Sequence, residues 1–220
     1  MARQTKEEAE RTREAVLDAA ERVFLERGVG RATLEDVARA AGFTRGAVHW
    51  HFGDKPGLFN ALAERVRLVE ERVARRIAAE GGPDPLENLG RAVLEALAGL
   101  EADPRQRRSL TVLRLRCEYT EEMAPALDRQ RAADALLREA TRRAFADAAA
   151  RGRLAPGWEP GTAALAFHAL VGGLVDGWLR GEGGFSLTGD GAEAIRAFLG
   201  AVATGDPARD RRGTAMSGPR

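Results

Sequence analysis

The sequence predicts an all-α fold of about nine helices, three in an N-terminal head and six in a bundle. Apolar residues recur at three- and four-residue spacings along most of the chain, which is the period of an amphipathic helix. No segment shows the apolar–polar alternation of a half-buried strand, and no internal repeat is present. Breaks rich in glycine or proline, such as Gly81–Pro85, separate the predicted helices.

The first predicted helix runs from about Glu10 to Arg27 and ends at Gly28. Its apolar stripe, which recurs at helical spacing, is formed by Leu17, Ala20, Val23 and Phe24. Because such a stripe is stable only when it is buried, this helix is expected to form the core of the head.

Two short helices joined by a tight turn are predicted next, between Thr33 and Phe52. Thr33 can cap the first of them, with Asp36 three residues on as its capping-box partner. Gly42 supplies the left-handed residue that ends this helix. The residues at helical spacing on its inner face are Leu34, Val37, Ala38 and Ala41.

The second short helix is capped by Thr44 and turns Val48 and Phe52 inward, four residues apart. The residues left on its outer side, which include a cation, a large aromatic ring and a glycine, are Arg45, Gly46, His49 and Trp50. This layout predicts a helix-turn-helix, whose second helix lies in the DNA major groove. On pattern alone, a surface helical hairpin is an equal alternative.

Six further helices form the predicted bundle. A long helix begins near Lys55 and runs to Gly81. The five that follow are expected at about 86–100, 105–119, 121–151, 162–179 and 191–202. The predicted parts are therefore a head at 1–54, a bundle at 55–204 and a disordered Gly/Pro/Arg-rich tail at 205–220.

Composition limits the class of protein. The 220 residues are 44% hydrophobic, enough for a substantial core, and the net charge of +1 gives no overall basic excess for DNA. Cys117 is the only cysteine, which excludes an internal disulfide and favours a cytoplasmic location. No apolar run approaches the roughly 20 residues of a membrane span, and the N-terminus is not signal-like.

The segment FTRGAVHWHFGDKPGLF closely resembles the signature of the TetR family of bacterial transcriptional repressors, and within it the branch that controls multidrug efflux pumps. MARQTKEEAERTREAVLDAAERVFLERGV and RRSLTVLRLRCEYTEEM, the latter at Arg107–Met123, are similar to the same branch. The resemblance spans roughly residues 1–204. It implies a three-helix DNA-binding head with a helix-turn-helix, a six-helix ligand-binding and dimerisation bundle, and a homodimer on a palindromic operator.

Roles on DNA follow from this resemblance and from side-chain chemistry. Arg45 can hold O6 and N7 of guanine with two hydrogen bonds, or contact a phosphate. Lys55 begins a helix, so its ammonium would lie at a phosphate unless it is an incidental surface lysine. His51 is either a phosphate donor or a packing residue. The expected DNA-binding residues are Thr33, Thr44, Arg45, Gly46, His49, Trp50, His51 and Lys55.

His49 departs from the family pattern, in which this position is usually tyrosine. A neutral histidine still donates one hydrogen bond, and an unperturbed histidine becomes a cation near pH 6.5. We therefore expect operator affinity to rise on acidification more steeply than in relatives with tyrosine. His49 and His51 point about 200° apart on a helix, so they cannot chelate one metal ion.

An apolar effector pocket is expected between helices of the bundle. The family's pocket, carried over by position, falls on Val66, Leu110, Arg114, Leu137, Thr141, His168, Val171, Gly172 and Asp176. Leu110 and Gly172 replace polar residues of relatives, so a small hydrophobic or aromatic effector of different identity is expected. Arg114 and Asp176 either line the pocket or form a structural ion pair.

The last two helices are too apolar for an ordinary surface. The residues expected at a homodimer interface are Phe167, Leu170, Leu174, Trp178, Ile195, Phe198, Leu199 and Val202. Burial of the same residues inside a monomer is the alternative. A two-fold dimer would double the contacts of the recognition helix on a palindromic site.

No catalytic motif, cofactor motif or metal-ligand pattern is present in the sequence, so neither an enzyme nor a cofactor is expected. The resemblance implies a ligand-responsive repressor of an efflux pump or similar neighbouring operon, with DNA and a small effector as partners and no membrane. A DNA-binding activator or architectural protein would share the head. A small-molecule carrier or helical enzyme would use the bundle alone.

Overall fold

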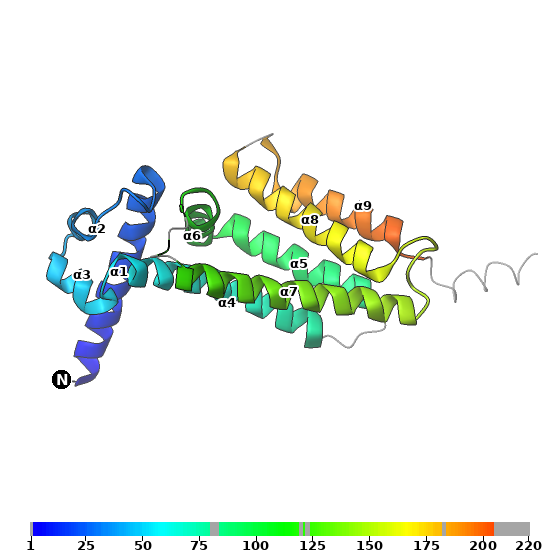
Figure 1. Cartoon of the computed structure of the whole chain (residues 1–220), viewed down its shortest axis with the longest axis horizontal. Helices are drawn as coiled ribbons and strands as arrows, with labels where there is room; N and C mark the ends of the chain where they lie inside the picture. The colour runs from blue at the N-terminus through cyan, green and yellow to red at the C-terminus, as the bar shows by residue number, and fades with distance from the viewer. Residues whose placement is uncertain (1, 80–83, 119–120, 122–123, 182–183, 205–220) are drawn as a thin grey trace, which may run out of the picture. The chain divides into compact units, whose positions relative to one another are not determined.

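The computed structural model describes residues 2–79, 84–118, 121, 124–181 and 184–204. Nine α-helices and one short π-helix, η3, follow one another in these residues (Figure 1). Their bounds are α1 Ala2–Arg27, α2 Leu34–Ala41, α3 Arg45–Phe52, α4 Lys55–Ala79, α5 Pro85–Ala102, α6 Pro104–Leu115, α7 Ala124–Ala150, α8 Pro160–Arg180, η3 Leu187–Gly191 and α9 Ala192–Val202.

The chain divides into two compact units. The first comprises Met1–Glu70 and Ala102–Asp134, and the second comprises Glu71–Glu101 and the chain from Ala135 onward. This division differs from the boundary expected at residue 54. It does so because α6 and the first part of α4 pack with the head, through contacts between segments far apart in sequence.

The core of the first unit forms around α1, as its apolar stripe predicts. Leu17, Ala20, Val23 and Phe24 are all buried, and α2 and α3 pack beside α1 (Figure 1). Val37 of α2 and Val48 of α3 are fully buried against this face. The inner residues of the helix-turn-helix therefore hold α3 in place and leave its other side outward.

Two helix ends differ from the predicted ones. α1 begins at Ala2 rather than near Glu10, because its polar first turns are rich in good helix formers and carry the Glu7–Arg11 pair. α6 ends at Leu115 rather than near residue 119. Its C-cap Arg116 turns its carbonyl to the backbone N–H of Val29, 3.0 Å away, which ends the helix by a tertiary contact.

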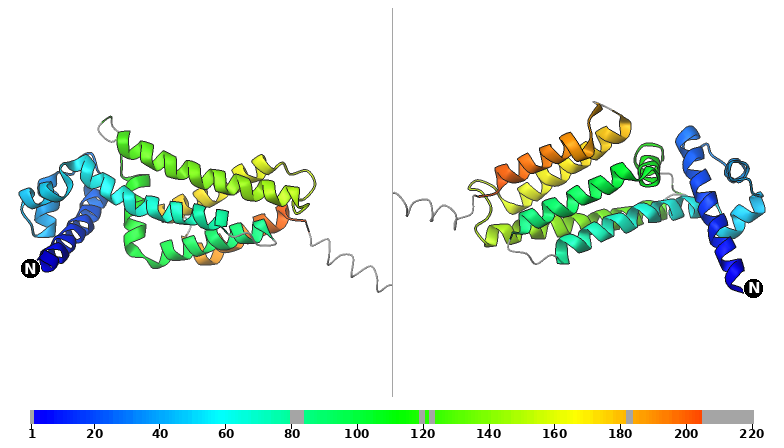
Figure 2. Two further views of the ribbon diagram at one scale, coloured as in Figure 1. Left: turned by 90° about the horizontal axis from the view of Figure 1, so that it is seen from below. Right: turned by 180° about the vertical axis from the view of Figure 1, so that it is seen from behind.

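An aromatic cluster lies in the core of the second unit. The Phe167 ring of α8 lies 6.0 Å from Phe145 of α7 and 5.9 Å from Phe198 of α9, centre to centre. Trp158 packs on Phe198 at 5.8 Å. Helices α8 and α9, yellow and orange, run side by side (Figure 2).

Polar contacts fix the connection between α8 and α9. The Glu101 carboxylate at the end of α5 accepts hydrogen bonds from the backbone N–H and hydroxyl of Thr188 in η3, at 2.9 and 2.6 Å. A further bond of 3.2 Å comes from the Ser186 hydroxyl. α5 also approaches α9 closely at Gly90, where a Cβ atom would lie 2.8 Å from a Leu199 methyl group.

The expectation that no segment is apolar enough to span a membrane is wrong for α8. Among the described residues it alone has the length and composition of a span, and only 28% of its most apolar window is buried inside the chain. The helix packs on α9 and η3 and supplies Phe167 to the core, as a helix of a folded bundle does.

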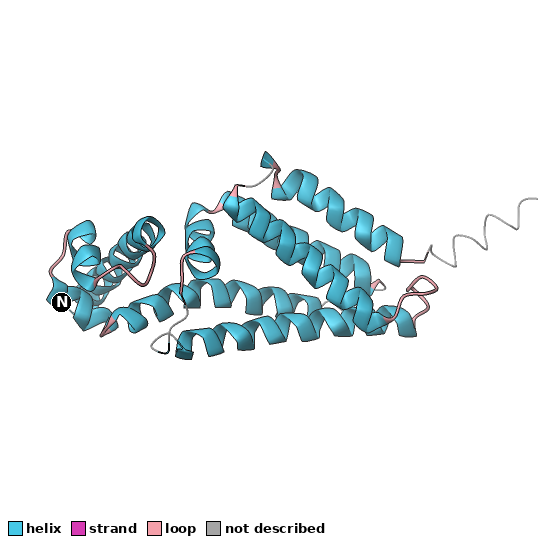
Figure 3. Cartoon of the chain, turned by 45° about the horizontal axis from the view of Figure 1, so that its top comes forward, coloured by secondary structure: helices cyan, strands magenta, loops and turns pink. Residues whose placement is uncertain are grey.

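The all-helical fold class is confirmed. The described residues contain helices and connecting loops (Figure 3), with a single isolated bridge between Leu154 and Ala203. The three helices expected of the head, α1–α3, are present, and the six helices α4–α9 follow them along the chain. The predicted tail at 205–220 lies outside the described residues.

Candidate nucleic-acid interface

The first helix of the helix-turn-helix has the predicted capping box. The Thr33 hydroxyl accepts from the Asp36 backbone N–H at 3.1 Å and donates to the Asp36 carboxylate at 2.7 Å. The Asp36 carboxylate in turn accepts from the Thr33 backbone N–H at 3.1 Å. The hydrogen bond from the hydroxyl is the main cause that lowers the pKa of Asp36. A DNA phosphate would have to compete with Asp36 for this hydroxyl.

The turn between α2 and α3 is tight and uses its glycine as predicted. Gly42 adopts φ 74° and ψ 24°, a left-handed conformation that favours glycine. The backbone N–H of Phe43 then closes the turn on the carbonyl of Ala38 at 3.0 Å. Thr44 caps α3 by accepting from the Ala47 backbone N–H at 3.2 Å, and its hydroxyl hydrogen can still be donated to a phosphate.

The outer face of α3 is open to solvent. Arg45, Gly46 and His49 are exposed, and the Trp50 side chain is 74% exposed. An exposed indole of this size is unusual on a folded surface and is typical of residues that meet a partner. The predicted DNA-facing residues of α3 therefore share one accessible face, opposite the buried Val48.

His51 differs from these residues because it is half-buried. Its ring contacts Trp50 edge-on, with centres 4.6 Å apart, and lies 5.9 Å from Phe52. Burial, together with the Arg13 charge, lowers the pKa of His51, so its neutral form is favoured. Packing accounts for this geometry, and its donation to a phosphate stays a prediction.

Lys55 is the first residue of α4 and is half-buried. Its ammonium donates to the carbonyl oxygen of Gly30 at 3.1 Å, in the turn between α1 and α2. Because an ammonium has three donors, this bond leaves donors for a phosphate. Lys55 thus ties the start of α4 to the head and lies at the edge of the helix-turn-helix.

Cys117 follows α6 and is half-buried near Lys55. Burial, with the Glu118 charge as a second cause, raises the pKa of its thiol to about 11, against the opposing charge of Lys55. A thiol with this pKa is almost wholly protonated at neutral pH and is a poor nucleophile. Cys117 therefore acts as a packing residue.

The predicted effector residues are divided between the two units. Val66 and Leu110 are buried and Arg114 is exposed in the first unit. The six in the second unit, of which Thr141 is buried and the others are partly exposed, are Leu137, Thr141, His168, Val171, Gly172 and Asp176. The pocket that they would form together stays a prediction.

Two open grooves of about 570 Å³ each lie within the second unit. One runs between α5 and α9, past Leu94 and Leu199. The other runs between α4 and α7, past Ile77 and Leu136. None of the predicted effector residues lines either groove.

A polar pair that the sequence did not single out lies beside the predicted effector residues of the first unit. Gln130 of α7 donates from Nε2 to both carboxylate oxygens of Glu70 of α4, at 2.9 and 3.0 Å. Burial raises the pKa of Glu70 to about 7, against the opposing charge of Arg114. Oε1 of Gln130 is buried without a hydrogen-bond partner among the described residues. The available signal was the spacing of Glu70, four residues after the buried Val66.

Half of the predicted dimer interface is buried inside the single chain. The residues that are at most 9% exposed are Phe167, Trp178, Ile195 and Val202. This burial fits the alternative in which the most apolar stripe of each helix packs inside the monomer, and the place of these four residues at a homodimer interface stays a prediction. Leu170, Leu174, Phe198 and Leu199 keep partial exposure.

Each of α8 and α9 also presents an exposed line of mainly small residues, beside the exposed Glu193 and Arg196 on α9. On α8 it carries Leu165, which is 67% exposed, followed at four-residue spacing by Ala169 and Gly173. On α9 it carries exposed Ala197 and Ala201. We call this face of five residues the small-residue face. Its residues recur at helical spacing, but they are less hydrophobic than the inner stripes of α8 and α9. This face was therefore not identified from the sequence.

The chain matches two family descriptions. Residues 16–62 match "Bacterial regulatory proteins, tetR family". Residues 84–203 match "MAATS-type transcriptional repressor, C-terminal region". The first match covers most of the head and the start of α4, and the second covers α5 to α9.

Relatives match along nearly the whole chain. The HTH-type transcriptional repressor BepR of Brucella suis is 42% identical over 205 residues, which cover 90% of this chain and 94% of BepR. The HTH-type transcriptional regulator TtgR of Pseudomonas putida is 37% identical over 190 residues, 86% of this chain and 90% of TtgR.

Solved structures agree with these matches. NalD, described as the secondary repressor of the MexAB-OprM multidrug efflux pump in Pseudomonas aeruginosa, superposes with a TM-score of 0.78 at 42% identity, covering 91% of this chain and 99% of NalD. A complex of SmeT with triclosan gives 0.75 at 33% identity, covering 88% and 92%. The chain belongs to the TetR family of bacterial regulatory proteins, and is a transcriptional regulator rather than an enzyme.

Proposed function

We propose that the protein is a ligand-responsive repressor, which binds a palindromic operator as a homodimer and is released by a small hydrophobic or aromatic effector. The observation that carries this proposal is the outer face of α3, where Arg45, His49 and Trp50 are exposed while Val48 on the opposite side is fully buried. The helix can therefore enter a major groove without losing its packing on the head. The repressor BepR, 42% identical along the chain, supports the direction of regulation.

On DNA, the exposed residues divide into reading and positioning roles. Arg45 reads guanine through O6 and N7 in the major groove. Thr44, at the start of α3, and Lys55, at the start of α4, contact phosphates on either side and fix the depth of the helix. Trp50 donates its indole N–H to a phosphate, and His49 adds a donor whose charge depends on pH.

The homodimer uses the small-residue face of α8 and α9. Small side chains at four-residue spacing let two helices approach closely, and Leu165 supplies an apolar side chain that otherwise stays in water. Partly exposed Leu170 extends the same surface. A two-fold axis here would present two recognition helices to half-sites one DNA turn apart, roughly 34 Å.

The effector binds beside the predicted effector residues of the first unit, Val66 and Leu110, with the Glu70–Gln130 pair of the same unit as a polar element. The free Oε1 acceptor of Gln130 suits an effector with a hydroxyl or amine donor. The triclosan complex of SmeT supports a small aromatic effector. Release of DNA is limited by the ratio of effector affinities for the free and operator-bound states.

The regulated genes are proposed to be an efflux pump or a similar operon next to the regulator, as NalD is named for a multidrug pump. The protein acts in the cytoplasm, where its DNA lies.

A footprint on the upstream intergenic DNA, combined with a reporter fused to the neighbouring promoter, tests repression. Protection that overlaps the promoter, with higher reporter output when the regulator is deleted, is expected. Protection upstream of the promoter with lower output on deletion would instead indicate an activator.

A further inference from the structure

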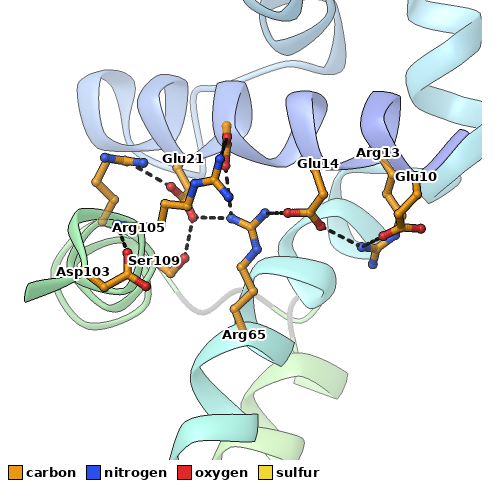
Figure 4. Close-up of polar contacts among 10 residues, drawn as sticks. Glu10, Arg13, Glu14, Glu21, Arg65, Asp103, Arg105 and Ser109 are labelled. Carbon is orange, nitrogen blue, oxygen red and sulfur yellow. Dashed lines mark hydrogen bonds and ion pairs between the residues drawn. The ribbon is translucent and has the colours of Figure 1, made fainter. Parts of the chain in front are cut away.

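Glu21 is a fully buried carboxylate in the middle of α1, with 0% of its side chain exposed. Its oxygen Oε1 accepts from Arg65 Nη1 at 2.7 Å and from the Ser109 hydroxyl at 2.6 Å (Figure 4). Its other oxygen, Oε2, accepts from Nε of Arg108 at 3.0 Å. A buried charge is tolerated only when it is paired and hydrogen-bonded, so this glutamate depends on all three partners.

The partners of Glu21 come from two other helices. Arg65 belongs to α4, and Arg108 and Ser109 belong to α6. The one carboxylate therefore joins α1, α4 and α6, all within the first unit. A change in the position of either neighbouring helix would leave a buried charge without a partner, which is costly.

Arg65 extends this junction along α1. Besides Glu21 it contacts Glu14 at 2.5 Å (Figure 4), and it lies 3.4 Å from Asp18. These carboxylates lie four and three residues apart along α1, on one face of the helix. The other oxygen of Asp18 pairs with Arg105 of α6 at 2.8 Å. Three carboxylates and the arginines facing them thus fix the axial position of α1 against α4 and α6.

Arg13 connects these charged residues of α1 to the recognition helix α3. Arg13 lies 3.4 Å from Glu14 and 3.8 Å from Glu10. Its guanidinium carbon lies 5.6 Å from the centre of the Phe52 ring, at the last residue of α3. The contacts therefore run from α6 and α4, through α1, to the end of the helix that meets DNA.

The C-terminal end of α6 is attached to α1 as well. The Arg116 guanidinium donates to the carbonyl oxygens of Leu25 and Glu26, at 2.7 and 2.9 Å, in the last turn of α1. A cation at this end also interacts favourably with the helix dipole. With Arg105 and Arg108 at its other end, α6 is held to α1 along its whole length.

We propose that Glu21 is a positioning residue for operator binding, whose buried charge holds α1 against α4 and α6 so that the recognition helix meets DNA correctly. The inference rests on the proposed repressor function. Because Glu21 is buried, it acts through Arg65, Arg108 and Ser109 and not through a contact of its own with DNA.

The direction in which one substitution changes operator affinity separates a positioning role from a purely electrostatic one. Removing a negative charge from a DNA-binding head strengthens binding to the polyanion when only long-range charge matters. Glu21→Gln should instead weaken operator binding by about tenfold, because it leaves Arg65 and Arg108 without their buried partner. Glu26→Gln is the matched control: it lies on the same helix, is exposed, and should leave binding unchanged or slightly tighter.

The measurement is fluorescence polarisation on the upstream intergenic DNA, at a temperature below the unfolding of every variant. A purely structural role lowers the melting temperature and leaves Kd of the folded protein unchanged. Ser109→Ala, which removes one hydrogen bond to Glu21, should also weaken operator binding, by about threefold. This variant replaces Glu21→Gln in the test if Glu21→Gln does not fold. In the Glu21→Gln background, Arg108→Gln should add nothing, because both act through one contact.

Unchanged or tighter binding by folded Glu21→Gln, or additive effects of the two substitutions, would overturn the proposal. If the wild type binds no DNA fragment selectively, the proposed repressor function fails. Hydrogen exchange of the free protein then tests the positioning role of Glu21 without DNA. We expect the amides of α6 to exchange about tenfold faster in Glu21→Gln than in Glu26→Gln. Equal exchange in the two variants would refute the positioning role independently of DNA.

Discussion

The ammonium of Lys55 donates a hydrogen bond to the carbonyl oxygen of Gly30, 3.1 Å away and 25 residues earlier in the chain. This bond joins the first residue of α4 to the turn that leads into the helix-turn-helix. One side chain therefore fixes the start of α4 and places a cation beside the face of α3 that we propose for DNA.

Lys55→Ala should weaken operator binding by about tenfold, because it removes a phosphate contact and loosens the start of α4. The slope of log K against log salt should fall by about 0.9, the change expected for one lost phosphate contact. Titrations at several salt concentrations measure both quantities. The control is Lys6→Ala at the chain's other lysine, which is exposed near the start of α1. An unchanged salt slope in Lys55→Ala would show that the ammonium serves only Gly30.

Acidification from pH 8 to pH 6 should strengthen operator binding by about threefold to tenfold, because a protonated histidine side chain adds a positive charge that DNA phosphates attract. His49 is the exposed histidine of α3, whereas burial lowers the pKa of His51 and favours its neutral form. His49→Tyr should therefore flatten the dependence of Kd on pH. The same pH dependence in wild type and His49→Tyr would assign the effect to other groups.

Glu70 should make the folded protein less stable as pH rises from about 4.5 to about 7. Its pKa in the folded protein is raised to about 7, mainly by burial, so the folded state holds the proton longer than the unfolded chain. Well above pH 7 the full cost is reached, and it is on the order of 3 kcal/mol. Urea unfolding at pH 5 and pH 8 should show a smaller difference for Glu70→Gln than for wild type.

Glu139→Gln is the control for this measurement. Hydrogen bonds from Arg142 and Arg143 lower the pKa of Glu139 to about 2, so it does not titrate between pH 5 and pH 8. The pH dependence of unfolding should match the wild type in this variant. If Glu70→Gln also matches the wild type, the carboxyl of Glu70 is ionised across the whole range.

Leu165→Asp should convert the homodimer to a monomer at micromolar concentration, because it replaces the largest apolar side chain of the small-residue face by a charge. Sedimentation equilibrium measures the change in mass directly. Leu136→Asp is the matched control, since Leu136 is also an exposed leucine, 55% exposed, but lies on α7. A dimeric Leu165→Asp variant would place the interface elsewhere, and a wild-type protein that is already monomeric would contradict the homodimer.

Local signals predicted the head well. The capping box of Thr33 and Asp36, the left-handed Gly42 and the buried Val48 each depend on neighbours within four residues, so the sequence alone specifies them. The inner stripe of α1 is similarly confirmed. Such features arise from backbone and side-chain chemistry within one helix and its caps.

Contacts between segments far apart in the chain could not be predicted from the sequence. Neither the partners of Glu21 nor the bond between Arg116 and the end of α1 has a local signature, so α6 was expected in the bundle alone. For a related reason, the sequence could not separate a dimer interface from burial inside the chain. Hydrophobic periodicity identifies the most apolar stripe of α8 and α9, and that stripe packs inward through Phe167 and Ile195.

The most direct test of the central claim is fluorescence polarisation of the purified protein on the DNA upstream of its own gene. It compares the wild type with the Arg45→Ala, Lys55→Ala double variant. We predict tight, sequence-selective binding by the wild type, roughly a thousandfold tighter than to unrelated DNA, and loss of that selectivity in the double variant. Equal binding to both DNA sequences, or selectivity that survives in the folded double variant, would contradict the assignment of this face to operator recognition.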